Sequence, residues 1–277
     1  MSERERRNVK LYLNLASEGL SCLGDHNENI NPKYFNEQKI LRICKRYSDL
    51  IAGLKLRISA EIATDSQTTS FDALRRGIEI AKRCGLPLSV HMPNFQGELS
   101  GLIDILRPGD IFCHVYTPQK GILEDGSVSE EMKRAVQKGI ILESACGKGH
   151  FGHECAGKAI QAGIEPNIIS GDFTKNTHHF EPAVSLPYLM SRFLGLGLSF
   201  EKVLSCCTTE PAKQMGMEGK IGCLKTGAFA NIAVLERRQK DIVFVDVKGK
   251  EVRGNELIIP VMTILEGEPV YRNMSAF

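Results

Sequence analysis

The sequence predicts an α/β protein in which helices wrap a parallel β-sheet, as in a (β/α)8 barrel reduced to about six of its eight strands. Three observations lead to this prediction. Short apolar runs alternate strictly with helical stretches from residue 9 to residue 217. Most of these runs are continuously apolar, as buried parallel strands are. The chain has 277 residues, and since a closed barrel takes about 250 by itself, little length remains for other parts.

The strands are expected where β-rich apolar runs stand between polar or glycine residues. Parallel strands need a crossover of a dozen or more residues, and the intervals between these runs are long enough for one. Six strands are predicted, at residues 9–16, 54–59, 86–91, 110–116, 139–145 and 167–172.

The helices are expected where apolar residues recur at helical spacing between those strands. Ser70 offers an N-cap for one of them and Gly85 a C-terminal stop. Acidic residues after Ser129 suit the first turn of another helix. The predicted helices cover residues 34–51, 71–84, 98–106, a stretch from Ser129, 153–162, 182–196 and 199–215.

The texture of the sequence changes near residue 217. Glycines there separate short β-rich runs at residues 231–235, 242–247 and 257–264, a pattern typical of antiparallel hairpins. We therefore expect two domains, a partial barrel over residues 1–217 and the C-terminal part of a small β-sandwich over residues 218–277.

The composition favours a cytoplasmic protein that acts on a small molecule. Lys and Arg number 35 against 33 Asp and Glu, a net charge of +2, which gives no basic footprint for nucleic acid. No apolar stretch approaches the length of a membrane helix, and the charged N-terminus lacks a signal-peptide core. Nine cysteines without a Cys-x-x-Cys pair are typical of buried thiols in a reducing compartment.

Four polar residues belong to different predicted strands: one lies inside the strand at 54–59, and the other three lie at or near the carboxyl ends of theirs, where parallel barrels carry their active sites. They are Lys55, His91, His114 and Asp172. Imidazole is a good zinc ligand, carboxylate suits zinc or manganese, and Asp172 could serve as a general base. Each also has a structural alternative: the histidines as hydrogen-bonded core residues, Lys55 as the partner of a carboxylate, and Asp172 as a helix cap.

The segments around these residues, at 53–59, 90–91, 109–114 and 169–172, resemble the metal-dependent amidohydrolase superfamily in its deacetylase or dihydroorotase-like branch. Residues 208–213 and the glycines after them are similar to the segment that leaves the barrel in that superfamily. The resemblance implies a (β/α)8 barrel with a small β-sandwich and a site for zinc or another divalent ion such as manganese. It implies that Lys55 is carboxylated and bridges metals, that His91 and His114 are ligands, and that Asp172 is a ligand and proton shuttle.

Two features depart from that superfamily. The His-x-His pair of its first barrel strand has no counterpart, since His26 is the only histidine before Lys55. The first two barrel strands and the N-terminal part of the sandwich are therefore expected to be missing, which leaves one metal at most. Lys148 stands where relatives tend to have histidine, and either binds an anionic group of the substrate or marks a changed pocket. His150, His153, His178 and His179 match no ligand position, and surface or substrate-loop roles are expected for them.

Three interpretations of the function stay open. The first is a hydrolase that cleaves an amide, cyclic amide or acyl ester with metal-activated water. The second is an impaired or non-catalytic homologue that needs a missing N-terminal fragment or a partner subunit. Its exposed strand edges favour homo-oligomerisation or complementation by such a fragment. The third is a sequence that begins at an internal methionine of a longer enzyme.

Overall fold

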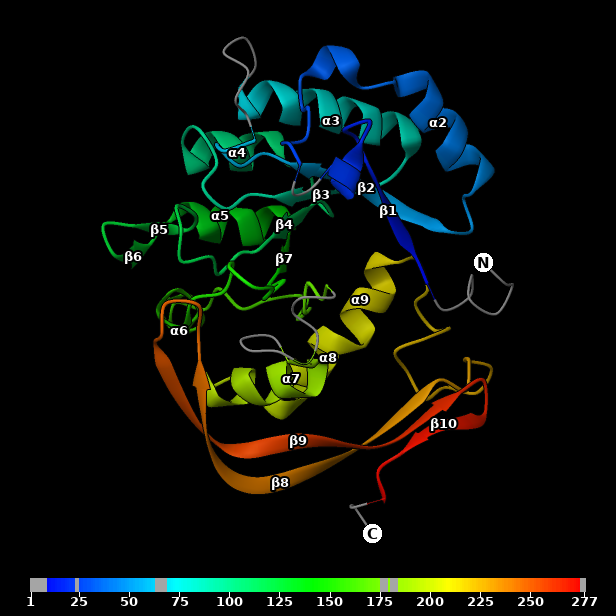
Figure 1. The fold of residues 1–277 in the computed structure, drawn as a ribbon, viewed down its shortest axis with the longest axis vertical. Helices are drawn as coiled ribbons and strands as arrows, with labels where there is room; N and C mark the ends of the chain where they lie inside the picture. The colour runs from blue at the N-terminus through cyan, green and yellow to red at the C-terminus, as the bar shows by residue number, and fades with distance from the viewer. Residues whose placement is uncertain (1–8, 23–24, 63–68, 175–178, 180–183, 275–277) are drawn as a thin grey trace. The chain divides into compact units, whose positions relative to one another are not determined.

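The computed structural model describes residues 9–22, 25–62, 69–174, 179 and 184–274 (Figure 1). The chain divides into two compact units, Met1–Glu143 and Ser144–Phe277, and each is described by itself. The domain boundary predicted after residue 217 stays a prediction.

The first unit is built on a five-stranded parallel sheet in the order β1-β2-β3-β4-β7. The strands are β1 (Leu11–Asn14), β2 (Ile51–Arg57), β3 (Leu88–His91), β4 (Ile111–Cys113) and β7 (Ile141–Glu143). Between them come α2 (Glu37–Arg46), α3 (Ser70–Cys84), α4 (Leu99–Ile105) and α5 (Glu131–Lys138), which Figure 1 shows outside the strands. The short strands β5 (Leu123–Glu124) and β6 (Ser127–Val128) form a hairpin that the sequence did not reveal.

The two faces of this sheet differ in chemistry because side chains alternate along each strand. One face is apolar and packs against helices: Gly77 of α3 lies against Leu56 and Leu88, both wholly buried. The opposite face carries polar side chains, because cross-strand register aligns Lys55 with Ser89. The same register continues that polar face through His91, Cys113 and Glu143.

Capping residues fix the ends of α3. Thr69, not Ser70, is its N-cap: the Thr69 hydroxyl accepts from the Asp72 amide, and the Asp72 carboxylate accepts from the Thr69 amide. Ser70 instead donates its hydroxyl to the Ile58 carbonyl at 2.7 Å. Gly85 ends the helix as predicted, at φ +66°, a left-handed conformation that glycine adopts without steric cost.

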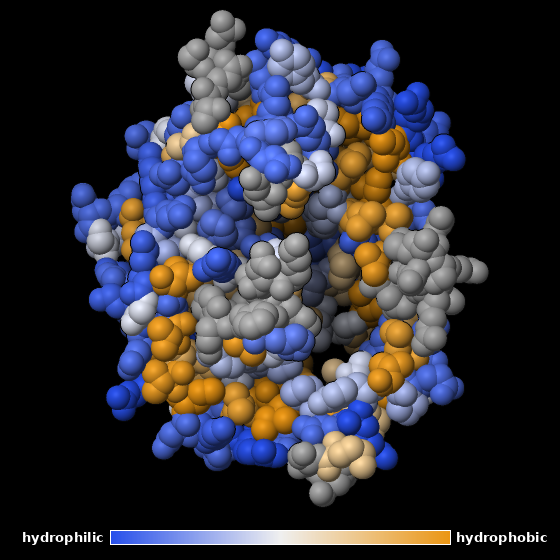
Figure 2. Space-filling view, viewed as in Figure 1, coloured by the Kyte–Doolittle hydropathy of each residue, from blue (hydrophilic) through white to orange (hydrophobic). Residues whose placement is uncertain are grey.

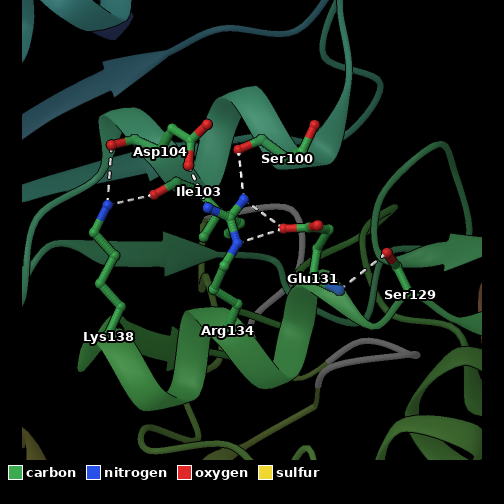
Figure 3. Close-up of polar contacts among 7 residues, drawn as sticks. All are labelled: Ser100, Ile103, Asp104, Ser129, Glu131, Arg134 and Lys138. Carbon is green, nitrogen blue, oxygen red and sulfur yellow. Dashed lines mark hydrogen bonds and ion pairs between the residues drawn. The ribbon is translucent and has the colours of Figure 1, made fainter.

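Basic side chains of α5 tie this helix to α4 (Figure 3). Lys138 donates to the carbonyls of Ile103 and Asp104 at 2.7 and 2.9 Å. These carbonyls lie at the C-terminus of α4, where the helix leaves acceptors unpaired and the dipole favours a cation. Arg134 donates to the Ser100 carbonyl at 3.0 Å and pairs with the Asp104 carboxylate.

The edge strand β1 exposes apolar side chains. Leu11 at its start is 45% exposed, and Val9, two residues before the strand, is 42% exposed. Figure 2 shows hydrophobic residues over this part of the unit. Within the described part of the chain β1 pairs on one side only, with β2. None of the described helices is both long and apolar enough to span a membrane.

The second unit combines helices with a three-stranded antiparallel sheet in the order β10-β9-β8. The strands are β8 (Ile232–Val245), β9 (Glu251–Leu265) and β10 (Glu268–Arg272), and the helices are α6 (His153–Gln161), α7 (Leu186–Gly195), α8 (Phe200–Cys207) and α9 (Thr209–Gln214). The sheet packs on α7, whose Ser191 hydroxyl accepts from the Ile258 amide of β9 at 2.8 Å.

Four predicted elements of this unit differ from the structure. The single helix expected over 199–215 is two helices that meet at Thr208, whose φ of −131° is not helical. The two runs at 231–235 and 242–247 belong to one strand, β8. Residues 167–172 form no regular strand, although their backbone accepts hydrogen bonds from residues 144, 146 and 147.

Candidate metal centre

Lys55 lies within β2 on the polar face of the parallel sheet. Its Nζ donates to Ser89 Oγ at 3.2 Å, so its structural partner in β3 is a hydroxyl. The Cys113 thiol of β4 lies between Lys55 and the Glu143 carboxylate. Burial is the largest cause that raises the pKa of this thiol, and the Glu143 charge raises it further, whereas the Lys55 charge lowers it. The net effect is a raised pKa, so Cys113 is a neutral neighbour of Lys55.

His91 and His114 form a close pair of imidazoles on the same unit. His91 ends β3 and His114 follows β4 directly. Their ring centroids are 4.5 Å apart with the planes at 76°, and candidate ligand nitrogens lie within 4.8 Å of one another. Both are buried, at 6% and 3% exposure. Because two imidazoles at this separation can bind one divalent ion, their donor chemistry fits a metal.

Backbone strain occurs at two of the four predicted site residues. His114 has φ +62° and Asp172 has φ +48°, a region that side-chain-bearing residues rarely occupy. Such a conformation costs about 1–3 kcal/mol and persists where the surrounding structure enforces it, often at functional sites. The positive φ of His114 is incompatible with a β-strand, so β4 ends at Cys113. The strand predicted from the sequence ran on to residue 116.

Asp172 and Lys148 lie in the second unit, and both are exposed. Asp172 caps none of the helices that the structure describes, because the next one, α7, has Ser185 as its N-cap. The helix-cap alternative is therefore wrong for these helices. Lys148 stands on a turn between Gly147 and Gly149.

The other histidines of this unit differ from one another. His153 is 4% exposed and its Nδ1 lies 2.8 Å from the Lys250 carbonyl, so the surface or substrate-loop role expected for it is wrong. Burial, and then Arg192, lower the pKa of His153. His150 is half-buried, the His179 amide donates to Val184, and His178 lies outside the described residues.

Comparisons with known proteins show which families this chain resembles. A family model described as the amidohydrolase family matches residues 191–271. Two relatives, both deacetylases by name, are 28% identical (Brucella anthropi) and 29% identical (Agrobacterium fabrum) over 97% of this chain. The chain is therefore similar to members of the amidohydrolase superfamily. It spans 66% and 65% of the lengths of these two relatives, somewhat less than two thirds.

Solved structures support the superfamily fold. A dihydroorotase superposes with a TM-score of 0.84 at 28% identity, covering 95% of this chain and 68% of that one. An adenine deaminase superposes with a TM-score of 0.88 at 21% identity, covering 96% and 71%, and this second likeness concerns the fold alone. The α/β architecture with a parallel sheet is therefore confirmed, whereas among the residues that the structure describes the sheet does not close into a barrel.

One buried group that contacts the polar face of this sheet escaped the sequence analysis. Glu28, whose side chain is 2% exposed, accepts from Arg57 Nη1 of β2 at 2.8 Å. Its other oxygen accepts from Asn14 Nδ2 of β1 at 2.8 Å. The spacing of Lys55 and Arg57 signals that both face the same way, but nothing in the polar loop before residue 30 marks Glu28 as buried.

Proposed function

We propose that this chain carries the catalytic site of a metal-dependent hydrolase that cleaves a carbon–nitrogen bond in an amide or cyclic amide, or an acyl ester. The observation that carries the proposal is the buried His91–His114 pair at 4.5 Å, on the sheet face that also bears Lys55. The names of the two deacetylase relatives and of the dihydroorotase structure support a small-molecule substrate of this class.

The donor set suits a divalent metal, and zinc is our first expectation, with manganese as an alternative. His91 and His114 would contribute imidazole nitrogens, and Lys55, once carboxylated as the resemblance implies, would contribute anionic oxygens. Asp172 would contribute a carboxylate oxygen, and the half-buried His150 is a candidate for a further nitrogen ligand. A metal held by these residues would polarise a carbonyl and lower the pKa of a water toward neutrality.

Three residues of the chain have further proposed roles, in proton transfer, in orienting Lys55 and in binding the substrate. Asp172 accepts a proton from the attacking water and returns it to the leaving nitrogen or oxygen. The Ser89 hydroxyl orients Lys55 through the hydrogen bond at 3.2 Å. Lys148, exposed on its turn, is proposed to meet an anionic group of the substrate.

The architecture that goes with this function is also part of the proposal. We infer that the parallel sheet belongs to a (β/α)8-type barrel domain over residues 1–217, and that β8–β10 belong to a β-sandwich segment over residues 218–277. A cytoplasmic location accords with the cysteine usage. The alternative is an impaired homologue that requires an N-terminal piece or a partner, favoured by the absence of a His-x-His pair from this sequence.

One experiment tests the metal site directly. The purified chain is dialysed against zinc, its metal content is measured by mass spectrometry, and hydrolysis of small N-acetyl and O-acetyl substrates is assayed. We expect about one metal per chain, lost in the His91→Ala/His114→Ala double variant. His26→Ala is the matched control, because His26 has a side-chain exposure of 59%.

The outcomes separate the two candidate functions. Metal together with hydrolysis supports the hydrolase, and metal without hydrolysis favours the impaired homologue. A chain that binds no metal, or a double variant that keeps it, would overturn the proposed centre.

A further inference from the structure

Gly147 lies against the predicted catalytic carboxylate within the second unit. Backbone hydrogen bonds join residues 144–147 to residues 168–171, and the Gly147 amide donates to the Gly171 carbonyl at 2.9 Å. This pairing brings the chain at Gly147 alongside the residue that follows Gly171, which is Asp172. Gly147 has φ +51°, a conformation that favours glycine.

The contact leaves no room for a side chain at position 147. A Cβ built on Gly147 would lie 2.5 Å from Asp172 Oδ2 and 3.3 Å from its Cγ and Cβ. A separation of 2.5 Å is far inside van der Waals contact, so Asp172 would have to move. Asp172 is itself held at φ +48°, which restricts how its side chain can be redirected.

We propose that Gly147 is a positioning residue for the Asp172 carboxylate, and that its lack of a side chain keeps this carboxylate in its working place. The inference rests on the proposed function, in which Asp172 carries a proton. The requirement is more specific than a glycine turn, because Gly163 of the same unit also has a positive φ, +78°, yet a Cβ built on it would meet no atom within 4 Å. Gly147 has both a positive φ and a close approach to the Asp172 carboxylate.

The position of a proton-transfer group matters because reactivity depends steeply on geometry. A displacement of about 1 Å can cost about 100-fold in rate. A methyl group at position 147 would displace the carboxylate without altering its charge. We therefore expect Gly147→Ala to lower kcat by about 10- to 100-fold and to leave KM nearly unchanged.

The matched control is Gly163→Ala. It imposes the same kind of backbone strain in the same unit but meets no neighbouring atom, so its kcat should stay within about twofold of the wild type. Circular dichroism of each variant establishes that it is folded before kinetics are compared.

A second measurement needs no activity. Thermal melting of Gly147→Ala is compared in the wild-type background and in an Asp172→Gly background, where the carboxylate is gone and glycine suits the positive φ. If the methyl group collides with Asp172, the melting-temperature loss caused by Gly147→Ala shrinks in the Asp172→Gly background. An equal loss in both backgrounds overturns the inference, because the clash must then lie elsewhere.

Asp172→Asn distinguishes this inference from the proposed function. If Asp172→Asn keeps full activity, the proposed role of Asp172 is wrong and the positioning role falls with it. If Asp172→Asn loses activity while Gly147→Ala keeps it, the positioning role alone is overturned. Loss in both variants, with Gly163→Ala unaffected, is the expected result.

Discussion

Glu28 illustrates how one buried carboxylate can organise a polar face. It accepts hydrogen bonds from Arg57 on β2 and Asn14 on β1, each at 2.8 Å, so it joins the strand that bears Lys55 to its neighbour. A buried ion pair is poor evidence of net stabilisation, but removing one partner leaves the other charge uncompensated.

We predict that Glu28→Gln lowers the free energy of unfolding by about 3 kcal/mol, because the Arg57 guanidinium, only 18% exposed, loses its counter-charge. Urea denaturation measures the change. Glu79→Gln is the control, since Glu79 pairs with Arg76 at 64% exposure, and should cost less than about 0.5 kcal/mol. Equal effects of the two substitutions would contradict the buried pair.

His153 predicts how acid affects the second unit. Burial and the nearby Arg192 lower the pKa of His153 below its ordinary value of 6.5, so the unfolded chain takes up this proton before the folded protein does. Stability that depends on His153 is therefore fully present above pH 6.5 and is lost as the pH falls from there toward the folded pKa, by at most about 1.4 kcal/mol per pH unit.

The measurement compares urea denaturation at pH 7.5 and pH 5.5 in the wild type and in His153→Gln. The variant is expected to be less stable at pH 7.5, because His153 is buried and lies 2.8 Å from the Lys250 carbonyl, but to show a smaller difference between the two pH values. An unchanged pH difference would rule out His153 as a source of acid sensitivity.

At the residue scale, the sequence predicted the candidates whose signal is local. His91, His114 and Lys55 stand in or just after strands, and the structure puts them on one unit with the two imidazoles in contact. Gly147 and Glu28 were missed because their roles depend on contacts with Asp172 and Arg57, residues about 25 to 30 positions away. No composition or periodicity rule reports such contacts.

At the scale of the elements, α4 and α5 are joined by two hydrogen bonds from a lysine side chain to backbone carbonyls, in addition to apolar packing. Lys138 donates to the carbonyls of Ile103 and Asp104 (Figure 3), which lie in the last turn of the seven-residue helix α4. A helix this short gains little stability by itself. Its end therefore depends on partners supplied by α5.

We predict that Lys138→Met, which keeps much of the apolar stem and removes the ammonium, lowers the free energy of unfolding by about 1 kcal/mol. Hydrogen exchange at the α4 amides should accelerate in parallel. Lys133→Met is the matched control on the same helix, because Lys133 pairs with exposed Glu130, and it should leave α4 protection unchanged. Faster exchange in both variants would assign the effect to general loss of charge.

The ends of helices and strands were only partly predictable from sequence patterns. The helix ending at Gly85 was predicted because a left-handed stop is a one-residue signal. Thr69 was passed over as the N-cap in favour of Ser70, since both residues can cap and only the backbone geometry decides between them. The break at Thr208 has a signal that the sequence analysis passed over: Pro211 has no amide to donate to the Cys207 carbonyl four residues earlier. The long strand β8 carries a register shift near Gln239, and the polar residues there made it look like two separate strands.

At the scale of the whole molecule, the proposed metal ligands come from both compact units of the chain. Lys55, His91 and His114 belong to the unit Met1–Glu143, and Asp172 belongs to the unit Ser144–Phe277. A ligand that binds only the folded state stabilises it in proportion to its concentration, by about 2.7 kcal/mol at 100 times Kd. The distribution of that stabilisation along the chain reports which residues hold the metal.

We predict that zinc slows hydrogen exchange at the carboxyl ends of β3 and β4, next to His91 and His114, and also in residues 168–172 around Asp172. Mass spectrometry of peptides from the exchanged protein, with and without zinc, measures both regions. The effect should vanish in the His91→Ala/His114→Ala double variant and persist in His26→Ala. Protection confined to β3 and β4 would remove Asp172 from the ligand set while leaving the histidine pair in place, and protection in neither region would remove the metal from both.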